Sequence, residues 1–164
     1  MQLTTLLTLA TAAVPALSAV LPTRATTVGS AIVNNKCTFP VTLWSVGSSV
    51  SSPVTLAAGS GSYAEAFVKD PVTGGKALKI TTTADGLYTG APELIFAYSL
   101  DGDNIWYDLS SVFGDAFAGH KVVLQGKGTG SCGAIEWANG TQMAGSQTKV
   151  CGSAGAVVLD LCAA

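Results

Sequence analysis

The chain has 164 residues, a formal net charge of −2 and only 11% charged residues. This length fits one domain, and the near-balanced charge excludes a generic basic nucleic-acid-binding protein, which needs clustered Lys and Arg. One His and four Cys without a His/Cys cluster argue against a zinc site. We therefore expect no metal, no cofactor and no nucleic-acid partner.

The first 19 residues, MQLTTLLTLATAAVPALSA, are apolar or small and carry no charged side chain. Such a segment, ending in small residues, is typical of a secretory signal peptide. A membrane anchor needs about 20 apolar residues, whereas this run is shorter, rich in Thr and interrupted by Pro15. The sequence thus predicts an exported protein without a membrane partner: a signal peptide at 1–19, a flexible lead-in at 20–29 and one domain at 30–164.

Short strand-like runs separated by turn residues follow along the chain. Apolar patterns predict strands at residues 31–34, 39–46, 62–69, 76–82, 94–100, 104–109, 122–124, 135–137, 149–151 and 157–162. In 39–46 both alternating faces are partly apolar, which suits an inner strand of a sandwich. No run of ten or more residues has a helical pattern with caps. The chain is therefore predicted to be an all-β sandwich or barrel of short antiparallel strands.

All four cysteines lie beyond the predicted cleavage site: Cys37, Cys132, Cys151 and Cys162. An even number in an exported chain indicates disulfides, and four cysteines permit three pairings. We favour Cys37–Cys162, which would tie the first strand to the last, with Cys132–Cys151, which would close a local loop. The other two pairings remain open at this point.

Acidic residues concentrate in the segment DGDNIWYD at 101–108, and Asp115 follows closely. Strict alternation puts Trp106 and Asp108 on one strand face and Tyr107 on the other. A ring beside a carboxylate is typical of sugar binding, and two carboxylates about 5–10 Å apart can hydrolyse a glycosidic bond. The alternatives are a solvated hairpin turn and a calcium loop, although the sixth-position Gly and distal Glu of such a loop are missing. The candidate ligand-binding residues are Asp101, Asp103, Trp106 and Asp108.

Asn139-Gly140-Thr141 is a standard N-glycosylation sequon. The same Asn-Gly pair is typical of a tight turn, and the two interpretations are compatible. We predict that Asn139 is glycosylated in an exported protein.

Longer motifs carry a family resemblance. The segments AIVNNKCTFPVTLWSV and FAYSLDGDNIWYDLSSVFGDAF resemble two parts of thaumatin-like proteins. Residues 30–162 as a whole resemble more closely the small secreted fungal proteins of the Blastomyces yeast-phase-specific family, through VNNKC, LWSVGSSVS, LDGDNIWYDLS and the cysteines of KVC and LDLC. The resemblance implies a thaumatin-like β-sandwich.

The departures from the thaumatin-like pattern bear on catalysis. Family members with glucan-directed activity are similar in carrying an acidic cleft, and the resemblance places Asp108 on one cleft acid. Ala97, Ile105 and Phe113 stand where other acids are expected, and the disulfide-rich domain that walls the cleft has no counterpart in this sequence. One carboxylate cannot be both general acid and nucleophile or base. The resemblance therefore implies no catalytic residue.

These observations predict a secreted, non-catalytic interaction protein, either a fungal effector or elicitor or a cell-wall-associated protein. We expect a monomer that contacts a host or cell-wall protein or polysaccharide near residues 101–108. The alternative is a weak β-1,3-glucan-binding or glucan-hydrolysing antifungal protein that uses Asp108 with Asp103 or Asp115.

Overall fold

The computed structural model describes residues 27–130 and 132–164, so the predicted signal peptide and most of the predicted lead-in lie outside the described residues. This part of the chain contains the following elements, in order: β1 (Ser30–Asn35), β2 (Val41–Val46), β3 (Val54–Leu56), β4 (Gly61–Ala66), β5 (Lys76–Thr81), α1 (Gly86–Thr89), β6 (Glu93–Asp101), β7 (Asn104–Val112), β8 (Val122–Gly126), β9 (Ala134–Trp137), β10 (Lys149–Gly152) and β11 (Val157–Leu161). No helix among the described residues has the length and apolar character needed to cross a membrane.

All ten predicted strands are present, and β3 and α1 were not predicted. Both are short, at three and four residues, and so carry too few residues for a periodic pattern. The strand predicted from residue 39 begins at Val41 instead. Pro40 precedes it, and a proline cannot donate a ladder hydrogen bond.

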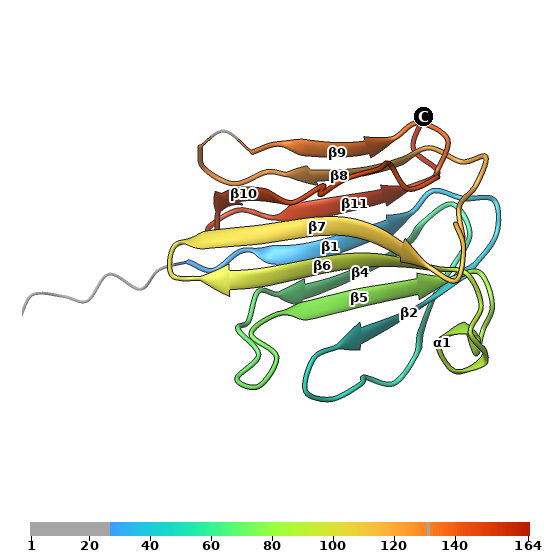
Figure 1. The fold of residues 1–164 in the computed structure, drawn as a ribbon, viewed down its shortest axis with the longest axis horizontal. Coiled ribbons are helices and arrows are strands. Elements are labelled where there is room, and N and C mark those ends of the chain that lie inside the picture. The colour runs from blue at the N-terminus through green and yellow to red at the C-terminus, as the bar shows by residue number, and fades with distance from the viewer. Residues whose placement is uncertain (1–26, 131) are drawn as a thin grey trace, which may run out of the picture.

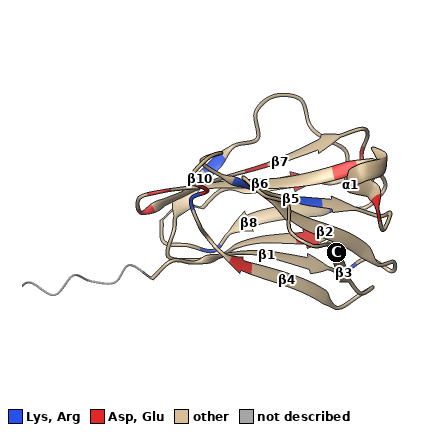
Figure 2. Ribbon diagram, turned by 90° about the horizontal axis from the view of Figure 1, so that it is seen from below, with Lys and Arg blue, Asp and Glu red and all other residues tan. Residues whose placement is uncertain are grey.

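The strands form two sheets packed face to face. One sheet has the order β4-β1-β11-β8-β9 and the other the order β10-β7-β6-β5-β2-β3. Figure 1 shows the strands running along the long axis, and Figure 2 shows the two layers, with β5, β6 and β7 in one and β1, β4 and β8 in the other. The fold is thus an all-β, thaumatin-like sandwich, as predicted. Its pairs are antiparallel except β1–β11, where strands from the two ends of the sequence lie parallel.

The core lies between the sheets and is built by alternation along each strand. Inward-facing side chains of the six-stranded sheet are fully buried, among them Leu43, Leu78, Ile80, Leu94, Phe96, Ile105, Tyr107 and Leu109. The five-stranded sheet contributes Val33, Val122, Leu124, Ile135, Trp137, Val157, Leu159 and Leu161. These residues belong to one continuous apolar cluster, so the two sheets share one core.

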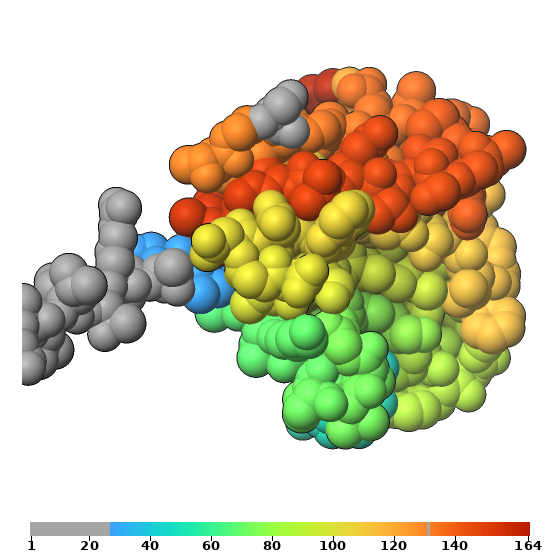
Figure 3. Space-filling view, turned by 60° about the vertical axis from the view of Figure 1, so that its left-hand side comes forward, coloured from blue at the N-terminus to red at the C-terminus, as the bar shows by residue number. Residues whose placement is uncertain are grey.

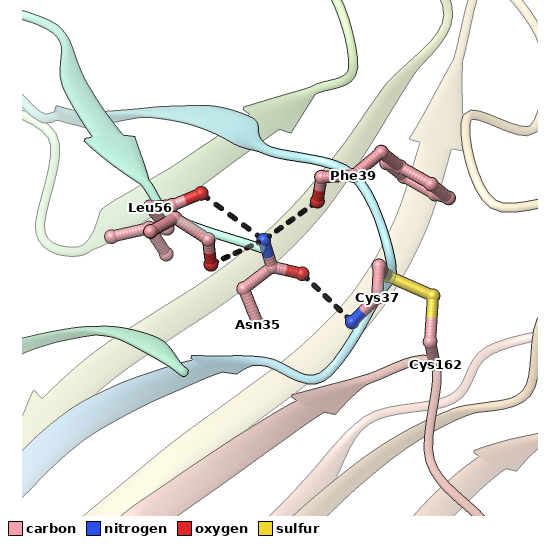
Figure 4. The surroundings of a disulfide bond; sticks show 6 residues. Asn35, Cys37, Phe39, Leu56 and Cys162 are labelled. Atoms are coloured by element: carbon pink, nitrogen blue, oxygen red, sulfur yellow. Dashed lines mark hydrogen bonds between the residues drawn. A yellow bond between two sulfur atoms is a disulfide. The ribbon is translucent and has the colours of Figure 1, made fainter. Parts of the chain in front are cut away.

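The structure has the two disulfides that the sequence analysis favoured, Cys37–Cys162 and Cys132–Cys151. Buried Asn35 lies beside the first of them (Figure 4). Its side-chain amide donates hydrogen bonds to the carbonyl oxygens of Phe39 at 3.0 Å and Leu56 at 3.1 Å, and its Oδ1 accepts one from the Cys37 amide at 3.0 Å. Asn35 therefore fixes the loop that carries Cys37 against the segment around β3.

Candidate functional site

A groove of about 420 Å³ lies on the outer face of the six-stranded sheet. Its floor follows one row of paired residues across four neighbouring strands: Val46 on β2, Ala77 on β5, Ala97 on β6 and Asp108 on β7. The two alanines carry the smallest side chains of the row, so the floor is low at its centre. The groove is thus a consequence of sequence alternation that places small residues side by side.

Trp106 and Asp108 come together at one end of this groove, as the alternation of β7 predicts. Both residues line it, and the Trp106 side chain is 45% exposed. Tyr107, between them, is buried in the core. Figure 3 shows the yellow residues around the β6–β7 turn between the orange-red segments of the C-terminal half and the green segments that precede β5.

The Asp108 carboxylate has an unsatisfied oxygen. Its Oδ1 is buried and has no hydrogen-bond partner within the described part of the protein. Leaving a buried polar atom unpaired costs roughly 1–3 kcal/mol. A ligand that donates an O–H or N–H to this oxygen would remove that cost, while the exposed Trp106 ring offers a surface on which the ligand can pack.

Asp101 and Asp103 do not share the groove. They lie at the end of the β6–β7 hairpin, are exposed, and are absent from the described residues that line the groove. Asp115 is committed elsewhere, because its Oδ1 accepts hydrogen bonds from the Ser111 hydroxyl at 2.7 Å and the Gln142 amide at 3.0 Å. Of the predicted acidic residues, the structure therefore brings only Asp108 to Trp106.

The positions that depart from the thaumatin-like pattern lie in three different environments. Ala97 is directly opposite Asp108 in the groove floor. Ile105 is fully buried in the core, and Phe113 is 72% exposed in the segment after β7. Asp108 is the only acidic residue lining the groove among the residues described. The groove therefore presents one carboxylate and one exposed indole ring, and no pair of carboxylates among the described residues.

Asn139 lies in the turn after β9 and is exposed. Gly140 takes a positive φ of 63° in this turn, which a glycine adopts without strain. The turn interpretation of the Asn-Gly pair therefore holds, and the side chain of Asn139 is accessible. Its glycosylation stays a prediction.

Three comparisons place the chain among known proteins. A family profile described as Blastomyces yeast-phase-specific protein matches residues 18–163. The secreted thaumatin-like protein calA of Emericella nidulans is 35% identical over 98 residues, which cover 60% of this chain and 53% of that protein, so the match spans about half the length of this relative. The crystal structure of the protein elicitor MoHrip2 from Magnaporthe oryzae superposes with a TM-score of 0.67 at 26% identity, covering 82% of this chain and 99% of that one.

Proposed function

The chain belongs to the Blastomyces yeast-phase-specific protein family, and from this membership we propose that it is a secreted, non-catalytic interaction protein that acts as an elicitor or effector. Its similarity to a protein elicitor and to a secreted thaumatin-like protein supports an extracellular role. Two disulfides fit the same compartment, because such bonds persist in oxidising surroundings.

The observation that carries this proposal is the groove at Trp106 and Asp108. It combines an exposed indole with a buried carboxylate oxygen that has no internal partner. Indole rings are enriched at the centres of binding sites, and an unpaired acceptor favours a partner with a matching donor. The partner is a host or cell-wall protein or polysaccharide that lies across the low floor of the groove.

Binding is favoured over glycoside hydrolysis by the same geometry. Hydrolysis needs two carboxyl groups on opposite sides of the scissile bond, and Asp108 has neither Asp103 nor Asp115 beside it in the groove. The glucan-directed alternative therefore reduces to glucan binding, which Trp106 stacking would support. Sedimentation with insoluble β-1,3-glucan, with an assay for released sugar, separates retention from cleavage.

Infiltration of leaf tissue with the purified secreted protein tests the elicitor proposal. We expect a defence response, measured as an oxidative burst, that is reduced at least about tenfold in Trp106→Ala and Asp108→Asn, since each loses roughly 1.4 kcal/mol or more of partner binding. Asp103→Asn, in the exposed turn outside the groove, is the matched control and should retain the response. Full activity of both groove variants, or sugar release that needs Asp108, would contradict the proposal.

A further inference from the structure

A second cavity, of about 270 Å³, lies in the seam between the two sheets. It is bounded by β2, by the edge strand β4, by the start of β5 and by residues 68–71, which connect β4 to β5. Its lining is more polar in character than that of the groove: Ser45, Ser49, Ser51, Tyr63, Glu65, Lys69, Asp70 and Lys76 all contribute. Nothing in the proposed function uses it.

Glu65 is the centre of a hydrogen-bond network in this seam. Its carboxylate accepts hydrogen bonds from the hydroxyls of Tyr63 at 2.8 Å and Tyr98 at 2.5 Å and from the Lys76 ammonium at 3.1 Å. Burial raises the pKa of Glu65, but these hydrogen bonds outweigh it and hold the pKa below its usual value. Burial and the bond to Glu65 raise the pKa of Tyr63 to about 12. Glu65 is thus an anion and Tyr63 a neutral donor at physiological pH.

Both carboxylate oxygens of Asp70 accept hydrogen bonds from within the protein. Its Oδ2 accepts hydrogen bonds from the amide and hydroxyl of Ser48, both at 2.8 Å, and its Oδ1 accepts two from the amides of Val72 and Thr73, both at 2.9 Å. These bonds, led by the one from the Ser48 amide, lower the pKa of Asp70. Asp70 therefore shapes the cavity rim and is also ionised. With both carboxylates ionised, neither can serve as the general acid of a hydrolase.

The buried hydroxyl of Ser45 is the feature of this cavity that indicates a ligand. Its side chain is 5% exposed and lines the cavity, yet its hydroxyl oxygen is buried and makes no hydrogen bond within the described residues. Glu65 and Tyr63 lie near enough for this hydroxyl to lower the pKa of each. A buried hydroxyl without a partner is rare in folded proteins. A molecule that occupies the cavity would satisfy it.

The groups that remain available define the chemistry of that molecule. Lys69 is exposed at the rim and forms no ion pair with any described residue, and Lys76 keeps ammonium protons beyond the one it gives to Glu65. Glu65 accepts three bonds out of roughly four that a carboxylate can take. The site can therefore both donate and accept hydrogen bonds. The formal charges of its two carboxylates and two ammonium groups sum to zero. Neutral hydroxyl groups match this balance, whereas an anionic ligand would face Glu65 and Asp70.

We propose that the seam between β2, β4 and β5 is a binding site for one neutral saccharide unit, held by Ser45, Glu65 and Lys69. The volume is close to the lower end of the roughly 300–1,000 Å³ of small-molecule sites, so a single pyranose ring enters while the rest of a chain stays outside. The site adjoins the Trp106–Asp108 groove, because Gly47 and Lys76 line both cavities. It uses neither Trp106 nor Asp108 and does not depend on the elicitor proposal.

Titration of the full secreted protein with glucose, laminaritriose, chitotriose or mannotriose, followed by amide chemical shifts, tests this site. We expect saturable shifts for at least one probe at about millimolar concentrations, largest at residues 45, 49–51 and 63–71, none of which lines the Trp106–Asp108 groove. Ser45→Ala should weaken binding about tenfold, the loss of one buried hydrogen bond, and Lys69→Gln should weaken it too. Ser60→Ala, in an exposed turn, is the matched control.

The outcomes separate this proposal from the alternatives. No saturable shift with any probe, or shifts that Ser45→Ala leaves unchanged, would overturn it. Tighter binding of glucuronic acid than of glucose would also overturn the assignment to a neutral ligand. Shifts confined to the Trp106–Asp108 groove would refute this site while supporting sugar binding in the groove. Because Lys69 makes no hydrogen bond to Glu65, Lys69→Gln leaves the Glu65 network intact and tests the site without a variant that could lose the fold.

Discussion

Buried polar residues are held in this protein by several partners each, and their loss is predicted to be costly. Asn35, at the end of β1, is 1% exposed, and its side chain hydrogen-bonds to backbone groups of the loop between β1 and β2 and of the end of β3. Removing such a side chain leaves buried backbone groups unpaired, and each such group costs roughly 1–3 kcal/mol. We therefore infer that the role of Asn35 is to stabilise the fold.

Replacing Asn35 with Ala should lower the free energy of unfolding by about 3 kcal/mol, because it leaves several backbone carbonyls and one amide without partners. Urea denaturation followed by fluorescence measures the change. Asn104→Ala, at the exposed start of β7, is the matched control and should stay within about 0.5 kcal/mol of the parent. Equal stability of the two variants would show that the Asn35 bonds contribute nothing net.

Asp70 should make stability depend on pH on the acid side. Hydrogen bonds, that from the Ser48 amide first, lower its pKa below the ordinary 3.8, so the unfolded chain takes up a proton before the folded one does. Its contribution is complete above that ordinary value and is lost as the pH falls below it.

Asp70→Asn should therefore destabilise the protein at pH 7 and by progressively less as the pH falls through about 4 toward 2. Urea midpoints for the parent and the variant across this range measure the difference. Asp101→Asn, an exposed acid in a hairpin turn, is the control and should show the parent's dependence. A constant difference between the parent and Asp70→Asn at all pH values would contradict the assignment.

The β6–β7 hairpin shows how much of an element the sequence predicts. Alternation in residues 104–109 correctly put Trp106 and Asp108 on one face, because the pleat fixes side-chain direction with a period of two. A hairpin turn, one of the alternatives for residues 101–108, is present, and Gly102 has a φ of 57° there. Alternation cannot say which strands lie beside β7, so the contribution of Ala77 and Ala97 to the groove could not be read from the sequence.

We expect the cost of replacing Gly102 to come from backbone strain alone. A Cβ at this position would meet nothing within 4 Å, so sterics with neighbours are not the obstacle. Gly102→Val should lower the free energy of unfolding by about 1–2 kcal/mol, since a β-branched residue rarely takes positive φ. Gly102→Asn, which tolerates that conformation better, should cost clearly less in the same urea experiment, and the reverse order would argue against strain as the cause.

At the scale of the whole molecule, the disulfides connect segments of very different separation. Cys37 and Cys162 are 125 residues apart and join the loop after β1 to the end of β11, its parallel neighbour, whereas Cys132 and Cys151 are 19 apart. In the chain-entropy description, a longer closed loop restricts the unfolded chain more. The first bridge is thus expected to be the more stabilising one.

Replacing both Cys37 and Cys162 with Ala should lower the free energy of unfolding by about 5 kcal/mol, against about 3 kcal/mol for the Cys132/Cys151 double variant. Thermal and urea unfolding of the two double variants, each with one bridge intact, measure the difference. A larger loss from the shorter loop would show that local packing, and not loop closure, dominates.

The sequence by itself determined the all-β class, ten of the strands, the family and the shared strand face of Trp106 and Asp108. These features depend on local periodicity, turn residues and motifs, which are properties of neighbouring residues in the chain. Only the tertiary structure decided which residues share a surface. Glu65 and Ser45 lie on predicted strands, yet these strands belong to different sheets, and their meeting depends on how the sheets pack. Strand pairing between segments far apart in the chain determines where the grooves and cavities lie. This pairing depends on the global packing of two apolar faces and not on any local pattern.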